Sequence, residues 1–252
     1  MGSTQQTRKY KKPNWKYVEI GKRDIALFRA IREQKFLTRM HVIEHVFGNS
    51  KSYAEIRIRK LKRFGYLKAL KVLANEPECY LLGEGGVEAL EEADQAEEEG
   101  SGNYPAPQDS IEIASYDHDK KVTNVRFLFQ GLGFCKDWKS EKMLRVGTKG
   151  ERKVPDGLFS RNGKGIAIEV ELNDKKPETY RKIFRLYDQN SRTHYVFYIC
   201  SSLSLLRKIM PLTRGIISKH VCFILYDELM EFREKAIVHT HKGNFQLKEV
   251  LG

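Results

Sequence analysis

Apolar residues in the first half of the chain recur at helical spacing in three successive segments, and two short apolar runs follow them. The spacing predicts helices over Arg23–Gln34, Arg39–Phe47 and Lys51–Phe64, and the runs predict strands over Tyr66–Leu73 and Cys79–Leu82. Thr38 is placed to cap the second helix, and Gly65 is placed to end the third. Three helices followed by a hairpin is the order of elements in a winged helix, and an acidic helix to about Glu98 comes after it.

The second half of the chain alternates short apolar strands with helical patterns. Helices are predicted over 122–131, around 140–144, and over 178–188 and 203–212, and strands over 157–160, 165–172, 194–200 and 220–226. The first two strands form a hairpin, because Asn162-Gly163 between them is a strong turn signal. A hairpin followed by helix, strand, helix and strand predicts a three-layer α/β core with a mixed sheet.

The segment 100–108 separates the two halves. It is made of small residues with Pro105 and Pro107, and it follows the acidic helix, as is typical of a linker. The sequence therefore predicts a basic N-terminal arm at 1–19, a winged-helix DNA-binding domain at 20–99, the linker at 100–108 and an α/β domain at 109–252.

The chain carries an excess of positive charge, with 45 Lys and Arg residues against 33 Asp and Glu and a net charge of +12. Such an excess favours an anionic partner, chiefly nucleic acid. The basic residues gather in the arm, at Arg8, Lys11 and Lys12, and on the third helix, at Arg57, Arg59, Lys60, Lys62 and Arg63.

On that third helix the apolar residues Tyr53, Ile56, Ile58, Leu61 and Phe64 are expected to face the core, so that the cations face outward. This is the arrangement of a helix that enters the major groove. The sequence predicts double-stranded DNA as the partner, with single-stranded DNA as a further one. The alternative is a basic helix on a protein-interaction module.

Hydropathy and cysteine usage indicate the cellular compartment. The mean hydropathy is -0.54, and no apolar run is long enough to cross a bilayer, so no membrane insertion is predicted. Cys79, Cys135, Cys200 and Cys222 are widely spaced and form no C-x-x-C pair. We expect a cytoplasmic protein without disulfides and without a zinc site.

Three carboxylates stand around the predicted hairpin. Asp156 begins one strand, and Glu169 and Glu171 lie two residues apart near the end of the other, so these two share a face. Carboxylates among apolar residues are costly unless they are solvated, paired or bound to a cation. Three such donors suit Mg²⁺ or Mn²⁺, and a bound ion can polarise a scissile phosphate. The alternative is a half-exposed strand whose glutamates face solvent beside Lys164 or Lys175.

The helix after the hairpin adds cations and tyrosines beside these acids. Its cations suit a phosphate backbone; they are Lys175, Lys176, Arg181, Lys182 and Arg185. Tyr180 and Tyr187 lie seven residues apart on one face, and either is a candidate nucleophile for a covalent link to phosphate. Tyrosines at this spacing more often pack against the core.

Two histidine motifs carry less weight. His118 lies between Asp117 and Asp119 and is a candidate for binding metal or DNA, but an acidic helix start explains the cluster as well. His239-Thr240-His241 has a polar middle residue and no third histidine nearby, so we interpret it as an exposed strand.

Pro155-Asp156 followed by Glu169-x-Glu171 resembles the PD-(D/E)xK nuclease signature, and Glu141 matches the upstream helical glutamate of many members. The family normally has lysine where this chain has Glu171, and Lys175, Lys176 or Lys182 are candidates to supply it. The wider layout is similar to the replication-relaxation family of plasmid proteins, and within it to the MobC-type conjugative relaxases. This resemblance covers most of residues 20–200 and rests on Leu37-Thr38, Tyr80-Leu81-Leu82-Gly83, Trp138-x-x-Glu141, Val154-Pro155-Asp156-Gly157, and Glu169-x-Glu171 followed by Tyr180 and Leu186-Tyr187.

The resemblance implies a restriction-endonuclease-like domain behind the winged helix, in a mobilisation relaxase that binds a plasmid transfer origin and nicks one strand. It implies that Asp156, Glu169 and Glu171 hold Mg²⁺ or Mn²⁺, with Glu141 as a further ligand, and that a lysine stabilises charge on the phosphate. Accessory relaxosome or coupling proteins are implied as partners. Two alternatives stay open: a non-catalytic plasmid replication or transcription regulator with a decayed nuclease fold, and a restriction or transposition endonuclease that cuts both strands.

Overall fold

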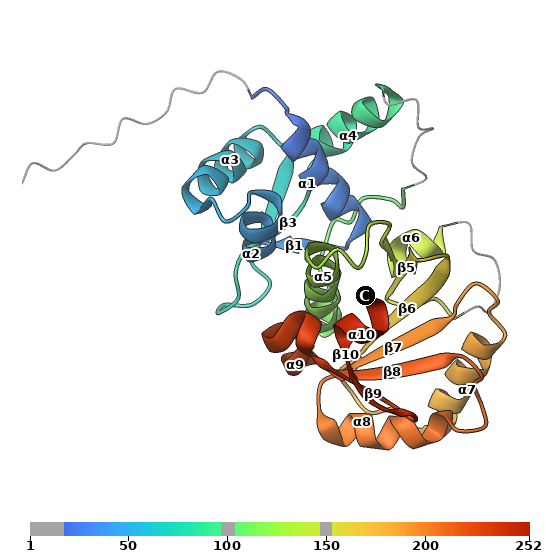
Figure 1. The fold of residues 1–252 in the computed structure, drawn as a ribbon. Coiled ribbons are helices and arrows are strands. Elements are labelled where there is room, and N and C mark those ends of the chain that lie inside the picture. The colour runs from blue at the N-terminus through green and yellow to red at the C-terminus, as the bar shows by residue number, and fades with distance from the viewer. Residues whose placement is uncertain (1–17, 97–103, 147–152) are drawn as a thin grey trace, which may run out of the picture.

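The computed structural model describes residues 18–96, 104–146 and 153–252, so the predicted DNA contacts of Arg8, Lys11 and Lys12 lie outside the described residues. The chain forms an N-terminal unit, residues 18–96, and a C-terminal unit, residues 104–252, which pack against each other (Figure 1). Within the described ranges, no helix combines the length and the apolar character needed to cross a membrane.

The N-terminal unit follows the predicted order of elements. Its helices are α1 (Lys22–Glu33), α2 (Arg39–His41) with a π-helical turn at Val42–Val46, α3 (Lys51–Arg63) and α4 (Glu84–Ala96). Its strands are β1 (Leu37–Thr38), β2 (Leu67–Leu70) and β3 (Cys79–Leu82), which form an antiparallel sheet in the order β1-β3-β2. Thr38 caps α2 as predicted, because its Oγ1 accepts a hydrogen bond from the His41 amide at 3.3 Å.

The buried side of α3 is narrower than predicted. The helix contacts the core through Ala54, Ile58 and Leu61, which are spaced at i, i+4 and i+7. Tyr53 and Ile56 are each 50% exposed, so the prediction that they face the core is wrong. Ile56 falls on the side of the helix opposite Ala54, whereas Tyr53 lies at the edge of the buried side, with its ring against Phe47.

The C-terminal unit is built on a seven-stranded sheet. Its strands are β4 (Lys139–Ser140), β5 (Gly157–Arg161), β6 (Lys164–Glu171), β7 (Tyr195–Cys200), β8 (His220–Leu225), β9 (Ile237–Thr240) and β10 (Gly243–Gln246). The strand order is β10-β9-β8-β7-β6-β5-β4, in which β6, β7 and β8 are parallel and the remaining neighbours are antiparallel.

Helices cover both faces of this sheet. They are α5 (Tyr116–Gly131), α6 (Glu141–Arg145), α7 (Pro177–Asp188), α8 (Leu203–Ile209), α9 (Tyr226–Phe232) and α10 (Leu247–Leu251). Residues of α5, α9 and α10 share one core with Ile168 and Val170 of β6, while α7 and α8 share another with Ala167 (Figure 1). The predicted three-layer α/β architecture with a mixed sheet is confirmed.

The predicted boundaries fail where the apolar pattern is weak. Helix α5 begins at Tyr116, six residues before the predicted start. The prediction missed the first turn because that turn carries Asp117 and Asp119 and shows no apolar stripe. Acidic residues nevertheless favour a helix N-terminus. The elements α9, β10 and α10 lie in a stretch for which the sequence predicted only the exposed strand at His239, and that strand is observed as β9.

Helix α5 joins the two units. Phe127 projects from it into the core of the N-terminal unit, where its ring stacks on His45 with centroids 4.4 Å apart. On the same helix Arg126 pairs with Glu33, and the Asn124 side-chain oxygen lies 2.6 Å from Nε2 of His41. Tyr104 of the linker is also bound to the N-terminal unit, because its hydroxyl accepts a hydrogen bond from Arg29 at 3.2 Å. Specific contacts therefore fix one unit against the other.

We expect acid to weaken this docking through His41. Burial, opposed by the hydrogen bond to Asn124, lowers the pKa of His41 from 6.5 to about 4. Between these two pH values the unfolded chain binds a proton here that the folded protein does not, so the free energy of unfolding falls as the pH falls. The loss approaches about 3 kcal/mol near pH 4. Urea denaturation above and below this window measures it, and His41→Gln should lose less stability on acidification; an equal loss in both proteins contradicts the assignment.

Candidate active site

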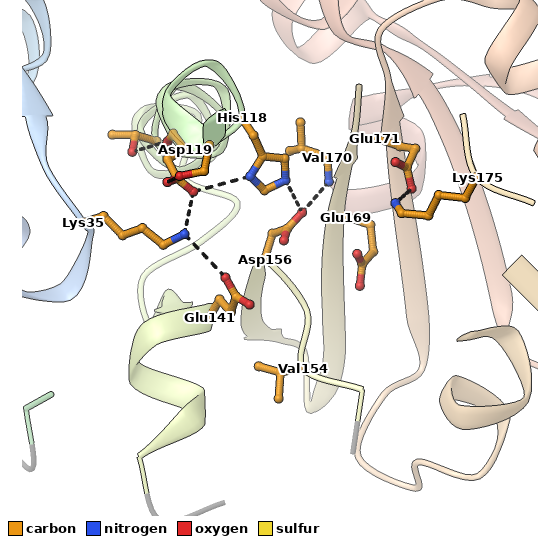
Figure 2. Close-up of polar contacts among 12 residues, drawn as sticks. Lys35, His118, Asp119, Glu141, Val154, Asp156, Glu169, Val170, Glu171 and Lys175 are labelled. Atoms are coloured by element: carbon orange, nitrogen blue, oxygen red, sulfur yellow. Dashed lines mark hydrogen bonds and ion pairs between the residues drawn. The ribbon is translucent and has the colours of Figure 1, made fainter. Parts of the chain in front are cut away.

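Asp156 stands immediately before β5, at one end of the β5–β6 hairpin. Because Gly157 pairs with Ile168, Asp156 comes beside Glu169 of the neighbouring strand. Its Oδ2 accepts a hydrogen bond from the Val170 amide at 2.8 Å and lies 3.2 Å from Nε2 of His118 (Figure 2). Burial would raise the pKa of Asp156, but the hydrogen bond and charge of His118 hold it below its usual value. Asp156 is therefore held as an anion.

Glu169 lies on the face of β6 that packs against α7, and it is 7% exposed. Its Oε1 is 2.8 Å from Nζ of Lys153 and accepts a hydrogen bond from the Tyr187 hydroxyl. Burial raises the pKa of Glu169 to about 7; Lys153 opposes this rise, and the charge of Asp156 adds to it. The two carboxylates are therefore close enough to repel each other, which is a situation that a bound cation relieves.

The other two predicted ligands lie on either side of this pair. Glu171 pairs with Lys175, and burial raises its pKa while Lys175 opposes the rise. Glu141 begins α6, and its amide donates to the Asp156 carbonyl at 3.1 Å. The Glu141 carboxylate is 2.6 Å from Arg145 and 3.8 Å from Lys35. The structure thus brings Glu141 beside Asp156, whereas Glu171 is engaged by Lys175 (Figure 2).

His118 connects Asp156 to the N-terminal unit. Its Nδ1 lies 3.4 Å from Asp119, and Asp119 accepts a hydrogen bond from Lys35 at 2.8 Å (Figure 2). Burial lowers the pKa of His118, but Asp119 and Asp156 outweigh it and raise the pKa to about 10. His118 is therefore a cation at neutral pH. The sequence offered His118 as a candidate, but nothing in the pattern pointed to Lys35, which precedes β1.

A pocket opens between the units in front of Asp156. Lys35 and its neighbours Glu33 and Gln34 line it from the N-terminal unit, and His118, Glu141 and Lys142 line it from the C-terminal unit. A ligand that reaches Asp156 through this pocket would contact both units.

The lysine nearest to the Asp156–Glu169 pair is one that the sequence analysis missed. Lys175 contacts Glu171, and Lys182 is exposed on α7. Lys153 contacts Glu169 instead, with its Nζ 2.9 Å from Oε2. Its position three residues before Asp156 is the signal that could have found it.

The two candidate nucleophiles lie between α7 and the sheet. Tyr180 is 0% exposed and Tyr187 is 1% exposed. The Tyr180 hydroxyl accepts a hydrogen bond from the Lys175 amide at 3.3 Å, and the Tyr187 hydroxyl donates to Glu169. Burial raises the pKa of both hydroxyls, which makes a phenolate costly at either position. These are the contacts of packing tyrosines, the role that helical spacing favours.

The donor set suits a divalent cation in part. Magnesium commonly takes one or two protein carboxylates and fills its remaining positions with water and substrate phosphate, which matches Asp156 and Glu169. Across the described parts of the chain, however, no three His, Cys, Asp or Glu side chains are placed to hold a metal ion together. His118, Lys153 and Lys175 each pair with one of the acids. The residues therefore fit a two-carboxylate site and do not converge as a four-carboxylate one.

The predicted DNA contacts on α3 divide into two groups. Arg59 and Arg63 are exposed on the outer side of the helix, and Lys60 is half-buried. Arg57 instead binds Asp24, with 2.8 Å between Nε and Oδ1, and Lys62 binds Glu78 at 3.0 Å. The first three remain predicted DNA contacts, while Arg57 and Lys62 are held by acids of their own unit.

Comparison with known proteins adds little to this geometry. No family model matches the chain, and no curated protein matches it. Among solved structures, the chain is similar to the small subunit (R.BspD6I2) of the heterodimeric restriction endonuclease R.BspD6I, at 16% identity over 49% of this chain and 69% of that chain, with a TM-score of 0.32. A similarity at this level carries no argument about fold or function.

Proposed function

We propose that the protein is a plasmid mobilisation relaxase, which binds a transfer origin and nicks one DNA strand by metal-dependent phosphodiester cleavage. One observation supports this most: Asp156 and Glu169 lie side by side at the end of the β5–β6 hairpin, largely buried, next to a pocket that opens between the two units. A buried pair of carboxylates is costly to a fold, and a metal-dependent nuclease has a use for one.

In this proposal Asp156 and Glu169 would hold Mg²⁺ or Mn²⁺, while Glu141 and Glu171, the other two ligands that the sequence predicted, do not converge with them in the described part of the chain. The bound ion would polarise the scissile phosphate and lower the pKa of a water. The chain's own residues orient the carboxylates: His118 and the Val170 amide fix Asp156, and Tyr187 fixes Glu169. Lys153 supplies positive charge where a phosphate would gain negative charge.

DNA binding falls to the N-terminal unit in this proposal. The outer side of α3 presents Arg59, Lys60 and Arg63, and the arm adds Arg8, Lys11 and Lys12. A net charge of +12 favours association with duplex DNA and, after nicking, with single-stranded DNA. Relaxosome or coupling proteins would complete the assembly at a transfer origin.

The two groups of cations on α3 lead to opposite expectations. Arg59→Ala should weaken binding to duplex DNA and lower the slope of log Kd against log salt by about 1, as for one lost phosphate contact. Arg57→Ala should act on stability, at a cost of about 3 kcal/mol, because it leaves Asp24 buried without its cation. Fluorescence anisotropy across a salt series and urea denaturation separate the effects. If Arg57→Ala instead lowers the slope of log Kd against log salt and leaves the free energy of unfolding unchanged, Arg57 contacts DNA after all.

Supercoiled plasmid carrying a candidate origin tests the catalytic proposal. Wild type and Asp156→Ala are incubated with Mg²⁺, with Mn²⁺ and with EDTA. We expect open circles with wild type in either metal and none with EDTA or with the variant, since Asp156 is the carboxylate held as an anion. Gel shifts with both proteins control for folding and DNA binding. Linear product would redirect the proposal to a restriction or transposition endonuclease.

A non-catalytic DNA-binding protein is the second candidate, and the ion pairs favour it. Lys153, Lys175 and His118 already neutralise the carboxylates that a metal would require. A plasmid replication or transcription regulator with a decayed nuclease fold would keep such pairs as structure. This candidate is supported if wild type shifts origin DNA but nicks none of the origins tested in either metal.

A further inference from the structure

Arg32, in the last turn of α1, is a buried cation, and some of its N–H groups have no hydrogen-bond partner. The residue is 8% exposed, and neither Nε nor Nη1 has a hydrogen-bond partner. Burial lowers the pKa of Arg32, and the charge of Glu91 offsets this only in part. A buried guanidinium with unsatisfied N–H groups costs free energy unless a ligand completes it.

Lys142 of α6 brings a second uncompensated charge to the same place. Burial together with the positive charges of Arg32 and Lys35 lowers its pKa to about 8, and no carboxylate of the described ranges acts against them. Lys35, by contrast, is engaged by Asp119 and Glu141. Two cations that repel each other across a protein interface, both short of anions, are the complement of a bound anion.

These side chains share a small pocket, called here the Arg32 pocket. It is lined by Arg32, Lys35 and Lys142 together with Pro107 and Gln108 of the linker. Lys35 and Lys142 also line the pocket in front of Asp156, so the two pockets adjoin. Arg32 comes from the N-terminal unit and Lys142 from the C-terminal unit.

We propose that the Arg32 pocket binds a phosphate group of the DNA backbone, held by the guanidinium of Arg32 and the ammonium of Lys142, beside the candidate cleavage site. The choice of DNA as the source rests on the proposed function; the choice of phosphate rests on the pocket. A guanidinium offers parallel N–H donors that match phosphate oxygens, and a lysine adds a compact charge. A phosphate here would contact both units and place the neighbouring part of the strand at the pocket in front of Asp156.

Thermal unfolding of the full chain in potassium phosphate and in potassium chloride, at equal ionic strength, tests the pocket. Wild type should gain roughly 2–4 °C in phosphate, because a ligand that binds only the folded state stabilises it. Arg32→Met and Lys142→Gln should lose this gain. Arg207→Gln, which removes an exposed cation from α8, should keep it.

Arg32→Met also separates a binding arginine from a structural one. Because the variant removes a buried charge whose Nε and Nη1 have no hydrogen-bond partner, it should melt no lower than wild type in chloride. A structural arginine would melt lower in chloride when replaced, and that result would overturn the proposal. So would the absence of any phosphate gain in wild type.

Duplex DNA distinguishes a backbone phosphate from a free one. Lys142→Gln should lower the slope of log Kd against log salt by about 1, and Arg207→Gln should leave the slope unchanged at this site. If phosphate raises the melting temperature of wild type but Lys142→Gln leaves the salt slope for DNA unchanged, the pocket would be assigned to free phosphate or a nucleotide. That result would overturn the assignment to a backbone phosphate. None of these readouts needs strand cleavage, so a wild type that fails to nick would reject the proposed function while leaving the pocket to be judged on its own results.

Discussion

Replacing Lys153 by methionine is expected to slow strand cleavage about 10²–10³-fold, as for loss of one group that stabilises charge in the transition state. Its ammonium lies 2.8 Å from Glu169 Oε1, against the Asp156–Glu169 pair. Without Lys153 the pKa of Glu169 should rise above 7, because Lys153 opposes the effect of burial. Glu169 would then carry a proton at neutral pH, where metal binding requires the carboxylate.

The matched controls are Lys175→Met and Lys182→Met, which make the same change at two of the three lysines that the sequence offered; the third is Lys176. Lys175 contacts Glu171, and Lys182 is exposed on α7, so each should cost far less than Lys153. The measurement is the initial rate of open-circle formation across a pH series. Lys153→Met should need a higher pH than wild type to reach its maximum. A greater loss at Lys175 than at Lys153 would assign the catalytic lysine to Lys175 and contradict the prediction.

The largest expected effect on stability comes from Phe127→Ala, at about 3–5 kcal/mol. Phe127 belongs to α5, but its ring fills the core of the N-terminal unit and stacks on His45. The substitution therefore leaves a cavity at the point where the units meet. Beyond lowering the free energy of unfolding, we expect it to uncouple the units, so that each unfolds in its own transition.

Phe129→Ala is the control on the same helix. Phe129 is 0% exposed and packs within the core of the C-terminal unit, so its loss should cost a similar free energy without affecting the docking. Urea unfolding is followed by far-UV circular dichroism, which reports both units, and by the fluorescence of Trp138 in the C-terminal unit, with the other tryptophan, Trp15, replaced by Phe in all proteins compared. The two probes should separate for Phe127→Ala and coincide for Phe129→Ala. Coincident probes in both variants would show that Phe127 does not couple the units.

The architecture of the C-terminal unit could be predicted because its central strands are long apolar runs bounded by strong turns. The Asn162-Gly163 turn, for example, fixes the β5–β6 hairpin, and Asn162 adopts the positive φ that this turn requires. The elements after Tyr226 are seven residues or shorter, too short to show a period. On α3, Tyr53 and Ile56 were wrongly assigned to the core, because the spacing of apolar residues alone does not show which of them face inward.

The candidate site was predictable in its acids but only partly in its cations, because the sequence offered His118 and Lys175 but neither Lys153 nor Lys35. The two-residue period of a strand places Glu169 and Glu171 on one face, and the hairpin places Asp156 beside them. Their partners come from elsewhere: Lys153 lies 16 residues from Glu169, and Lys35 lies 84 residues from Asp119. The Lys35 contact depends on how the two units pack, and the Lys153 contact depends on how the chain leads into β5. Helical and strand periods record neither.

The docking of the two units through α5 fixes the distance between α3 and Asp156. Phe127, Asn124 and Arg126 hold the N-terminal unit in one position, and with it the outer side of α3. If α3 reads DNA and Asp156 cuts it, the span between them acts as a ruler, and the nick falls at a constant offset from the recognised sequence. Such a protein selects its cleavage point by measuring along the duplex, with no need to read the bases at the point of cleavage.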